Sequence, residues 1–277
     1  MGVLYALASA LCYGLADFAG GLLARRSHFA AVALVGQTGG LLLALAAVPL
    51  LPATSLQPAD LAWGALSGVG TGIGMVFLFR GLSHGTMSVV VPVSAVAGVA
   101  LPVLVGVAVL GDRPSALAWL GVLIAVPALW LVSRDGRTDG GGPAGAPDAL
   151  IAGTGIALQY LALAQAGPGA GVWPVAAGRV AAIATVLPLV VRSRARLRMP
   201  PRRLLGAAAT GMTASAALVL YMLAAREQLL AIAVVLSSLY PAIPVLLGVT
   251  ALRERLTRWQ AAGLLGAGAA TLLLATG

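Results

Sequence analysis

Two charged and two amide side chains stand inside otherwise apolar stretches of the chain. Asp17 and Arg179 are the charged pair, and moving the chain by 142 positions places Asp17 on Gln159 and Gln37 on Arg179. A charge at the centre of a membrane helix costs about 2.5–3.5 kcal/mol on insertion scales, so each charge needs a functional or structural reason. Because all four polar positions obey one internal repeat, we predict a single polar cluster near the axis that relates the two copies.

Two interpretations of this cluster stand side by side. In the first, Asp17 and Arg179 line a central cavity, where one meets an ammonium group or a proton and the other meets an anionic group of a zwitterionic solute. In the second, the two charges form a structural salt bridge, while Gln37 and Gln159 make interhelical hydrogen bonds worth about 0.6 kcal/mol each. Asp17 is the only carboxylate predicted deep within a span, so it is also the candidate site for a coupling proton.

Aromatic, hydroxyl and thioether side chains at similar depth are candidates to complete a substrate pocket. Such residues also pack against neighbouring helices in any bundle, so packing is the alternative for each of them. The candidates are Tyr13, Thr71, Met75, Ser94, Tyr160, Thr213, Ser237 and Tyr240.

The composition requires a lipid bilayer around these residues. The chain has 277 residues, of which 60% are hydrophobic and only 9% charged, whereas a soluble domain is about 45–50% apolar and about 25% charged. A membrane helix needs roughly 20 apolar residues, so the length allows about ten spans. Helices are predicted because the alternating pattern of a β-barrel strand is missing. The predicted class is therefore all-α, with spans near 3–24, 30–50, 61–82, 87–109, 116–132, 149–166, 171–191, 204–223, 228–250 and 260–275.

The same displacement by 142 positions aligns the two halves of the chain without a gap. Residues 102–106 (PVLVG) fall on 244–248 (PVLLG), and the pair 112–113 (DR) falls on 254–255 (ER). We therefore predict a first five-helix repeat over 1–135, a Gly- and Pro-rich linker over 136–147 and a second repeat over 148–277. Five is an odd number of spans, so the second copy enters the membrane from the opposite face, and inverted repeats are a recurring plan of secondary transporters.

The arginines give an expectation for sidedness. Fourteen lie in odd-numbered loops and two in even-numbered loops, which places the odd loops in the cytoplasm and both termini outside. The arginines stand between apolar runs and form no continuous stripe, so nucleic-acid binding is not expected. No cofactor or metal is expected either, because Cys12 is the only cysteine and both histidines lie at span ends.

The chain resembles the EamA-type members of the drug/metabolite transporter superfamily. The resemblance covers nearly the whole chain and is most specific at residues 254–256 (ERL), followed by Gln260 and Gly263, after a helix that contains residues 240–241 (YP) and Pro244. The first copy departs from this pattern at Asp112 and Ala118.

The resemblance implies a ten-helix carrier of the bacterial inner membrane, often an exporter of amino acids or other small metabolites. Characterised members usually keep both termini in the cytoplasm, which conflicts with the arginine count, so sidedness stays open. A membrane-embedded enzyme is the rival interpretation, but the predicted spans lack paired acids or a Ser/His/Asp set. A channel or scaffold is the third alternative. The oligomeric state is not predicted.

Overall fold

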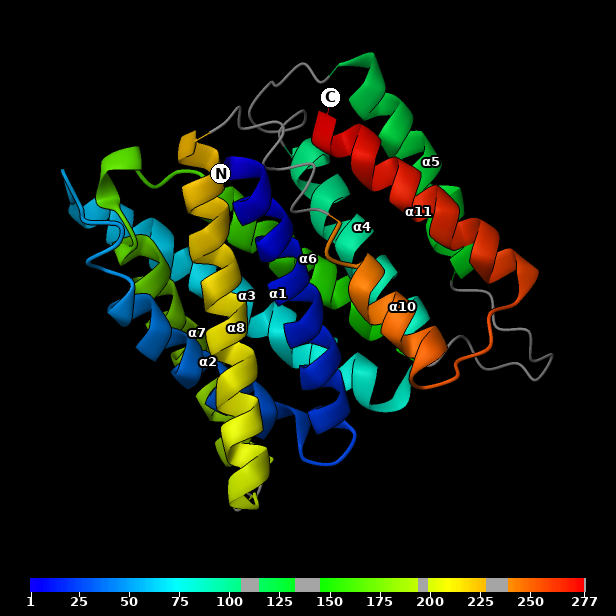
Figure 1. The fold of residues 1–277 in the computed structure, drawn as a ribbon, viewed down its shortest axis with the longest axis horizontal. Helices are drawn as coiled ribbons and strands as arrows, with labels where there is room; N and C mark the ends of the chain where they lie inside the picture. The colour runs from blue at the N-terminus through cyan, green and yellow to red at the C-terminus, as the bar shows by residue number, and fades with distance from the viewer. Residues whose placement is uncertain (106–114, 133–144, 194–198, 228–238, 277) are drawn as a thin grey trace.

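The computed structural model describes residues 1–105, 115–132, 145–193, 199–227 and 239–276, and over these residues it is built from helices without a strand. This confirms the all-α class (Figure 1). The α-helices are α1 (Gly2–Ala24), α2 (Phe29–Ala46), α3 (Pro58–His84), α4 (Met87–Val105), α5 (Ala116–Val132), α6 (Ala146–Leu163), α7 (Trp173–Arg192), α8 (Pro201–Glu227), α10 (Ala242–Thr250) and α11 (Arg258–Thr276), with a 3₁₀ turn, η2, at Pro168–Ala170.

Six helices among the described residues are long and apolar enough to cross a membrane: α1, α2, α3, α6, α7 and α8. Shorter apolar helical stretches are described at Met87–Gly98 and Ala116–Ala128. Of the predicted span at 228–250, the structure describes the part that contains α10, because 228–238 lie outside the described residues. Helix α6 begins at Ala146, so the last two residues of the predicted linker belong to its first turn.

Local sequence signals set several of these helix ends. The Nδ1 atom of His28 accepts a hydrogen bond from the Ala30 backbone N–H and so caps α2. At the start of α3, Asp60 and Gln57 form a capping box, with Pro58 in the first turn. Gly145 precedes α6 with φ of 90°, a left-handed conformation that glycine adopts without steric cost.

The helices pack mainly on helices of the other half of the chain. Helix α3 packs against α6 and α7, and the corresponding helix of the second half, α8, packs against α1 and α2. Helices α2 and α7, which correspond to each other in the repeat, also contact each other, as do α5 and α11. This reciprocal pattern indicates a pseudo-two-fold relation between the halves.

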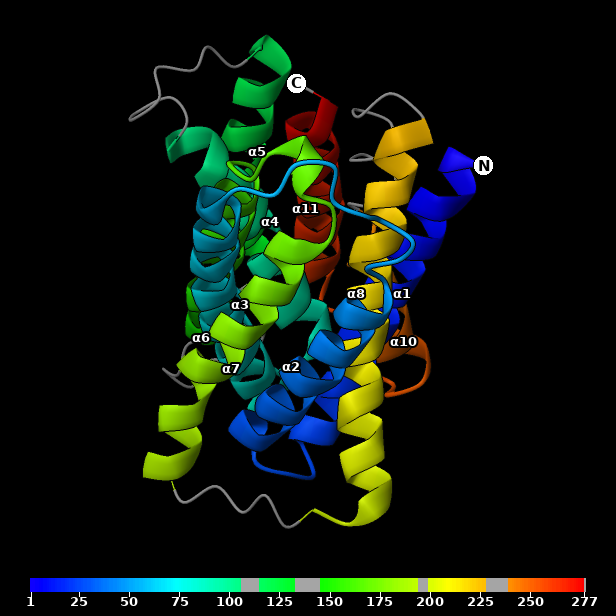
Figure 2. The same ribbon diagram turned by 90° about the vertical axis from the view of Figure 1, so that its left-hand side faces the viewer.

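Corresponding helices run in opposite directions through the bundle (Figure 2). Both chain ends lie at one face of the bundle, which we call the terminal face. Helix α1 ends at the opposite face, which we call the distal face. Arg203, in the first turn of α8, donates a hydrogen bond to the carbonyl of Arg26, just after α1. Asp148, in the first turn of α6, pairs with Arg80 near the end of α3. Helices α6 and α8 therefore begin at the face where α1 and α3 end.

Glycines bring the crossing helices into close contact at the centre of the bundle. Gly211 of α8 lies against the backbone of Gly36 on α2, and Gly68 of α3 lies against the backbone of Gly178 on α7. A Cβ atom at Gly211 or Gly68 would overlap the facing carbonyl oxygen. Gly36 and Gly178 occupy the same position in the two repeats, so both crossings use one device, a small residue that lets two membrane helices approach.

Candidate functional site

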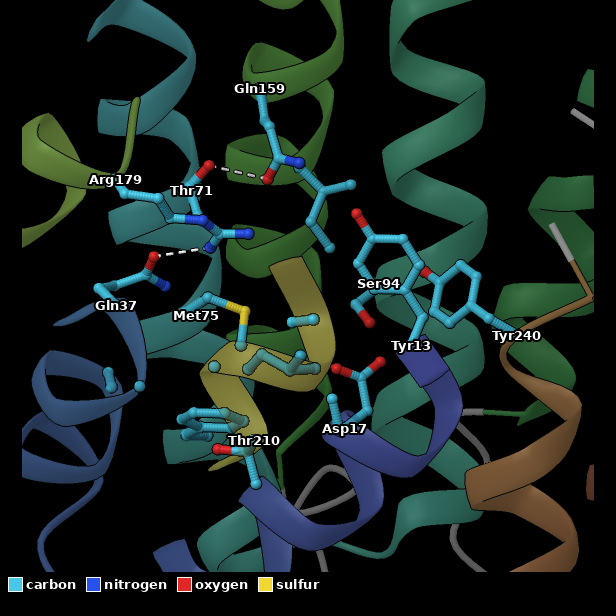
Figure 3. Close-up of a pocket in the computed structure, with 18 of the residues that line it drawn as sticks. Tyr13, Asp17, Gln37, Thr71, Met75, Ser94, Gln159, Arg179, Thr210 and Tyr240 are labelled. Carbon is cyan, nitrogen blue, oxygen red and sulfur yellow. Dashed lines mark hydrogen bonds between the residues drawn. The ribbon is translucent and has the colours of Figure 1, made fainter. Parts of the chain in front are cut away.

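A cavity of about 70 Å³ lies where these helices cross. Its wall draws on both halves of the chain and contains the polar residues labelled in Figure 3. The lining residues are Tyr13, Ala16 and Asp17 of α1; Ala33, Gly36 and Gln37 of α2; Thr71, Met75, Leu78 and Phe79 of α3; Ser94 of α4; Ile156, Gln159 and Tyr160 of α6; Arg179 of α7; Thr210, Gly211 and Ala214 of α8; and Tyr240.

Arg179 and Gln37 form a buried pair on one side of the cavity. The Nη1 atom of Arg179 donates a hydrogen bond of 2.8 Å to Oε1 of Gln37, and the two residues are only 7% and 3% exposed. A guanidinium group has five N–H donors, and this is the only hydrogen bond that Arg179 makes within the described part of the chain. The remaining donors are available to an anionic group that enters the cavity.

Asp17 lies across the cavity from Arg179 (Figure 3). The residue is 8% exposed, and its carboxylate has no hydrogen-bond or ion-pair partner among the described residues. The ion pairs found there join Arg25 to Glu254 and Arg80 and His84 to Asp148, so the structural salt bridge between Asp17 and Arg179 does not form. The reason is geometric, because Gln37 holds the guanidinium on the side of α2 while α1 carries the carboxylate on the other side.

Aromatic and hydroxyl groups surround the two charges. The rings of Tyr13 and Tyr240 lie beside Asp17, with their centroids 5.9 Å apart and their planes tilted by 53°. On the side of Arg179, the Thr71 hydroxyl lies 2.9 Å from Oε1 of Gln159 and forms an interhelical hydrogen bond. The cavity therefore has a cationic side with amide groups and an anionic side with aromatic rings.

Ten of the twelve predicted site residues line this cavity, and Thr213 is a described residue that does not. Ser237 lies outside the described residues. The hydroxyl of Thr213 donates to the carbonyl of Ala209 one turn earlier, and Thr210 takes its place in the wall. Whether the lining residues bind a solute stays a prediction.

On α8, the wall residues Thr210, Gly211 and Ala214 were not predicted from the sequence. Their spacing follows one helical face. In the sequence, this face is marked by the small residues Ala207, Gly211 and Ala214. The alignment of Thr213 with Thr71 in the repeat does not identify it.

The described residues contain no group of three or more His, Cys, Asp or Glu side chains that could hold a metal ion. Over the same residues, the polar wall of the cavity offers one guanidinium, one carboxylate, two amides and several hydroxyl groups. This set can bind and orient a small polar solute through charge and hydrogen bonds.

Comparisons with known proteins agree with this architecture. The model of the EamA-like transporter family matches over residues 1–134 and again over 145–276. One solved structure, described only as "Crystal structure of protein", is 19% identical, covers 99% of this chain and 97% of its own, and has a TM-score of 0.58. That likeness shows the fold alone. No curated protein matches the chain. Since the family match takes in both halves and nearly all of its length, the chain belongs to the EamA-like transporter family.

Proposed function

We propose that the chain is a secondary transporter that exports a small zwitterionic metabolite, of the size and charge of an amino acid, across the bacterial inner membrane. The observation that carries this proposal is the placement of two opposite charges, Arg179 and Asp17, on facing walls of one buried cavity, neither with an ion-pair partner among the described residues. A solute with a carboxylate and an ammonium group satisfies both charges at once. A solute with a single charge leaves one of them desolvated and unpaired, which is costly.

The proposed mechanism is alternating access around this cavity, in a bundle of ten membrane spans arranged as two inverted repeats. The cavity lies between halves whose corresponding helices run in opposite directions, as in carriers whose substrate site is at the repeat interface. In such carriers, one half rocks against the other and exposes the same site first to one face and then to the other.

We propose further that the distal face is cytoplasmic. The described arginines of this face lie at or beside helix ends: Arg25, Arg26, Arg80, Arg192, Arg202, Arg203, Arg253, Arg255 and Arg258. An excess of arginine marks cytoplasmic loops. This places both termini outside, and a C-terminal epitope tag that antibodies detect on intact spheroplasts checks it. Detection only after permeabilisation would reverse the assignment.

A ligand screen followed by a counterflow assay tests the proposed function. Purified protein is heated with members of a panel of amino acids, amines and sugars, and a zwitterion that fits the cavity raises the unfolding temperature. Proteoliposomes preloaded with that solute are then expected to take up its labelled form against its gradient, with saturation. A channel gives neither counterflow nor saturation. Stabilisation by sugars alone contradicts the proposed substrate class.

Asp17 is also the proposed site of a coupling proton. A buried carboxylate that has no partner in the described part of the chain can hold a proton on one side of the membrane and release it on the other. An imposed pH gradient is expected to drive net transport by the wild-type protein and not by Asp17→Asn. Equal stimulation of both proteins would remove Asp17 from the coupling step.

A further inference from the structure

An apolar layer closes the cavity toward the distal face. The ring of Phe79, which lines the cavity, lies against Gly20 of α1. The side chains of Leu82, about one turn after Phe79 on α3, and of Met87, at the start of α4, lie against Gly21 of α1. Both side chains are fully buried. A solute in the cavity therefore cannot leave by this route unless α1 separates from the junction of α3 and α4.

The Glu254 carboxylate joins the two halves of the chain directly beyond this layer. Oε1 accepts a hydrogen bond of 2.9 Å from the Met87 backbone N–H. Oε2 accepts bonds of 3.1 Å and 2.9 Å from the backbone N–H and the hydroxyl of Ser88. Glu254 lies between α10 and α11, whereas Met87 and Ser88 form the first turn of α4, so one side chain of the second half caps a helix of the first half.

Arg25 extends the same contact to α1 and α3. Its Nη2 atom lies 3.5 Å from Oε1 of Glu254, and the Glu254 side chain is 7% exposed. The guanidinium also donates to the carbonyl oxygens of Leu82 and Gly85 at the end of α3, over 3.0 Å and 2.9 Å. The ends of α1 and α3 and the start of α4 are thus held to the segment between α10 and α11 by one carboxylate and one guanidinium.

The backbone of α10 leaves space for this carboxylate. A Cβ atom built on Gly248 would lie 2.8 Å from Oε2 of Glu254, closer than side-chain atoms normally approach. The carboxylate therefore occupies a position that any residue larger than glycine at 248 would obstruct.

We infer that Glu254, Arg25 and Ser88 form a distal latch that holds the distal mouth of the cavity closed, and that Glu254 is a positioning residue for transport which never contacts the solute. The inference rests on the proposed alternating access and adds the groups that control one of its two openings. Opening toward the distal face requires Met87 and Ser88 to lose their acceptor and α1 to leave Phe79 and Leu82. The structure described here is accordingly the state closed at the distal face.

Thiol labelling of the cavity wall tests the latch without any solute. The native cysteine is removed with Cys12→Ser, and Ala214→Cys places one thiol in the wall. A membrane-impermeant maleimide is applied to one face at a time, in right-side-out and in inside-out vesicles. Glu254→Gln removes the charge and replaces an acceptor oxygen with an N–H donor, and Ser88→Ala removes one of the four bonds.

We expect Glu254→Gln to raise the labelling rate from the distal face about tenfold or more, as the loss of a charge-assisted hydrogen-bond cluster implies. Ser88→Ala is expected to give a smaller rise. Labelling from the terminal face falls in return, which distinguishes a shifted equilibrium from a misfolded protein that is labelled from both faces. Asp148→Asn is the matched control, because its carboxylate lies at the same face but pairs with Arg80 and His84.

An unchanged labelling rate in Glu254→Gln would overturn the latch. An equal rise in Asp148→Asn would also overturn it, because any charge lost at this face would then have the same effect. The proposed transport function has a separate test, since thiol labelling needs no solute. If the latch responds as expected but no panel solute shows counterflow, the proposed substrate class fails and the latch stands.

Discussion

Arg179 donates a 2.8 Å hydrogen bond to Gln37, the residue 142 positions earlier that occupies the same place in the other repeat. Two equivalent residues can touch only where the axis that relates the repeats passes between them. The guanidinium is thus bound at the centre of the molecule, on the contact between α2 and α7. Its hydrogen bond to an amide does not neutralise its charge, and no ion pair does so within the described residues, which is the basis for the proposed contact with an anionic group.

Gln37→Glu provides a first test, because it adds a carboxylate where the amide now accepts from Arg179. The new carboxylate is expected to form an ion pair with the guanidinium and compete with the anionic group of the solute. We predict that the KM for transport rises about tenfold or more, the scale of a hydrogen bond to a charged group, while thermal stability is kept.

Gln260→Glu is the control for the added charge, since Gln260 caps α11 through the Thr257 backbone N–H and does not line the cavity. An unchanged KM in Gln37→Glu, measured by initial rates in proteoliposomes, would mean that the guanidinium does not meet the solute.

Asp17→Asn tests the other side of the cavity. The amide cannot balance an ammonium group, so binding of a zwitterion is expected to weaken by about tenfold or more. Binding of an analogue without the amino group should change far less. Asp17→Glu should retain part of the wild-type preference for the zwitterion over this analogue. Calorimetric titration of both solutes measures this difference. If the affinity for both solutes falls by the same factor, the carboxylate of Asp17 does not recognise the ammonium group.

The sequence was sufficient to predict the described helices and the gathering of the four polar residues around one cavity. A helix boundary follows from apolar run length and from the charges, Pro and Gly that end each run. The repeat brought Arg179 and Gln37 together because residues equivalent under an internal axis lie at similar depth. The sequence could not decide whether Arg179 pairs with Asp17, because depth alone does not say on which side of the axis each side chain lies.

The sequence also could not predict the rotation of α8 about its own axis. Thr213 aligns with Thr71 in the repeat, yet Thr210 faces the cavity, because the close approach of Gly211 to Gly36 fixes which side of α8 points inward. Glu254 belonged to the residues that carry the family resemblance, but its contacts with Met87 and Ser88 span more than half the chain. Such a contact depends on tertiary structure and leaves no local pattern.

The two halves differ at one further pair of equivalent positions. Thr71 bonds Gln159 across α3 and α6, whereas the equivalent residues Thr213 and Asp17 make no such bond within the described part of the chain. A carrier built from inverted repeats and closed at one face must show such an asymmetry, because two identical halves would make both faces equivalent.

Gly64 and Gly206 occupy equivalent positions but differ in the space around them. A Cβ atom on Gly64 would overlap the backbone carbonyl of Pro174, whereas on Gly206 it would meet only the Leu23 side chain, at 3.4 Å. We predict that Gly64→Ala lowers the free energy of unfolding by about 1–3 kcal/mol, the usual cost of overpacking, and that Gly206→Ala is tolerated. Thermal unfolding in detergent compares them, and equal melting temperatures would contradict the crossing of α3 and α7.

Counterflow by purified Arg179→Ala tests the central claim most directly, with the zwitterion identified in the ligand screen as the solute. Loss of one partner of a buried charge contact is expected to lower exchange by roughly 30-fold or more. Arg192→Ala, at the exposed end of the same helix, should exchange at the wild-type rate. Size-exclusion chromatography establishes that the variant is folded. A folded Arg179→Ala protein that exchanges the solute at the wild-type rate would show that the central cavity is not the transport site.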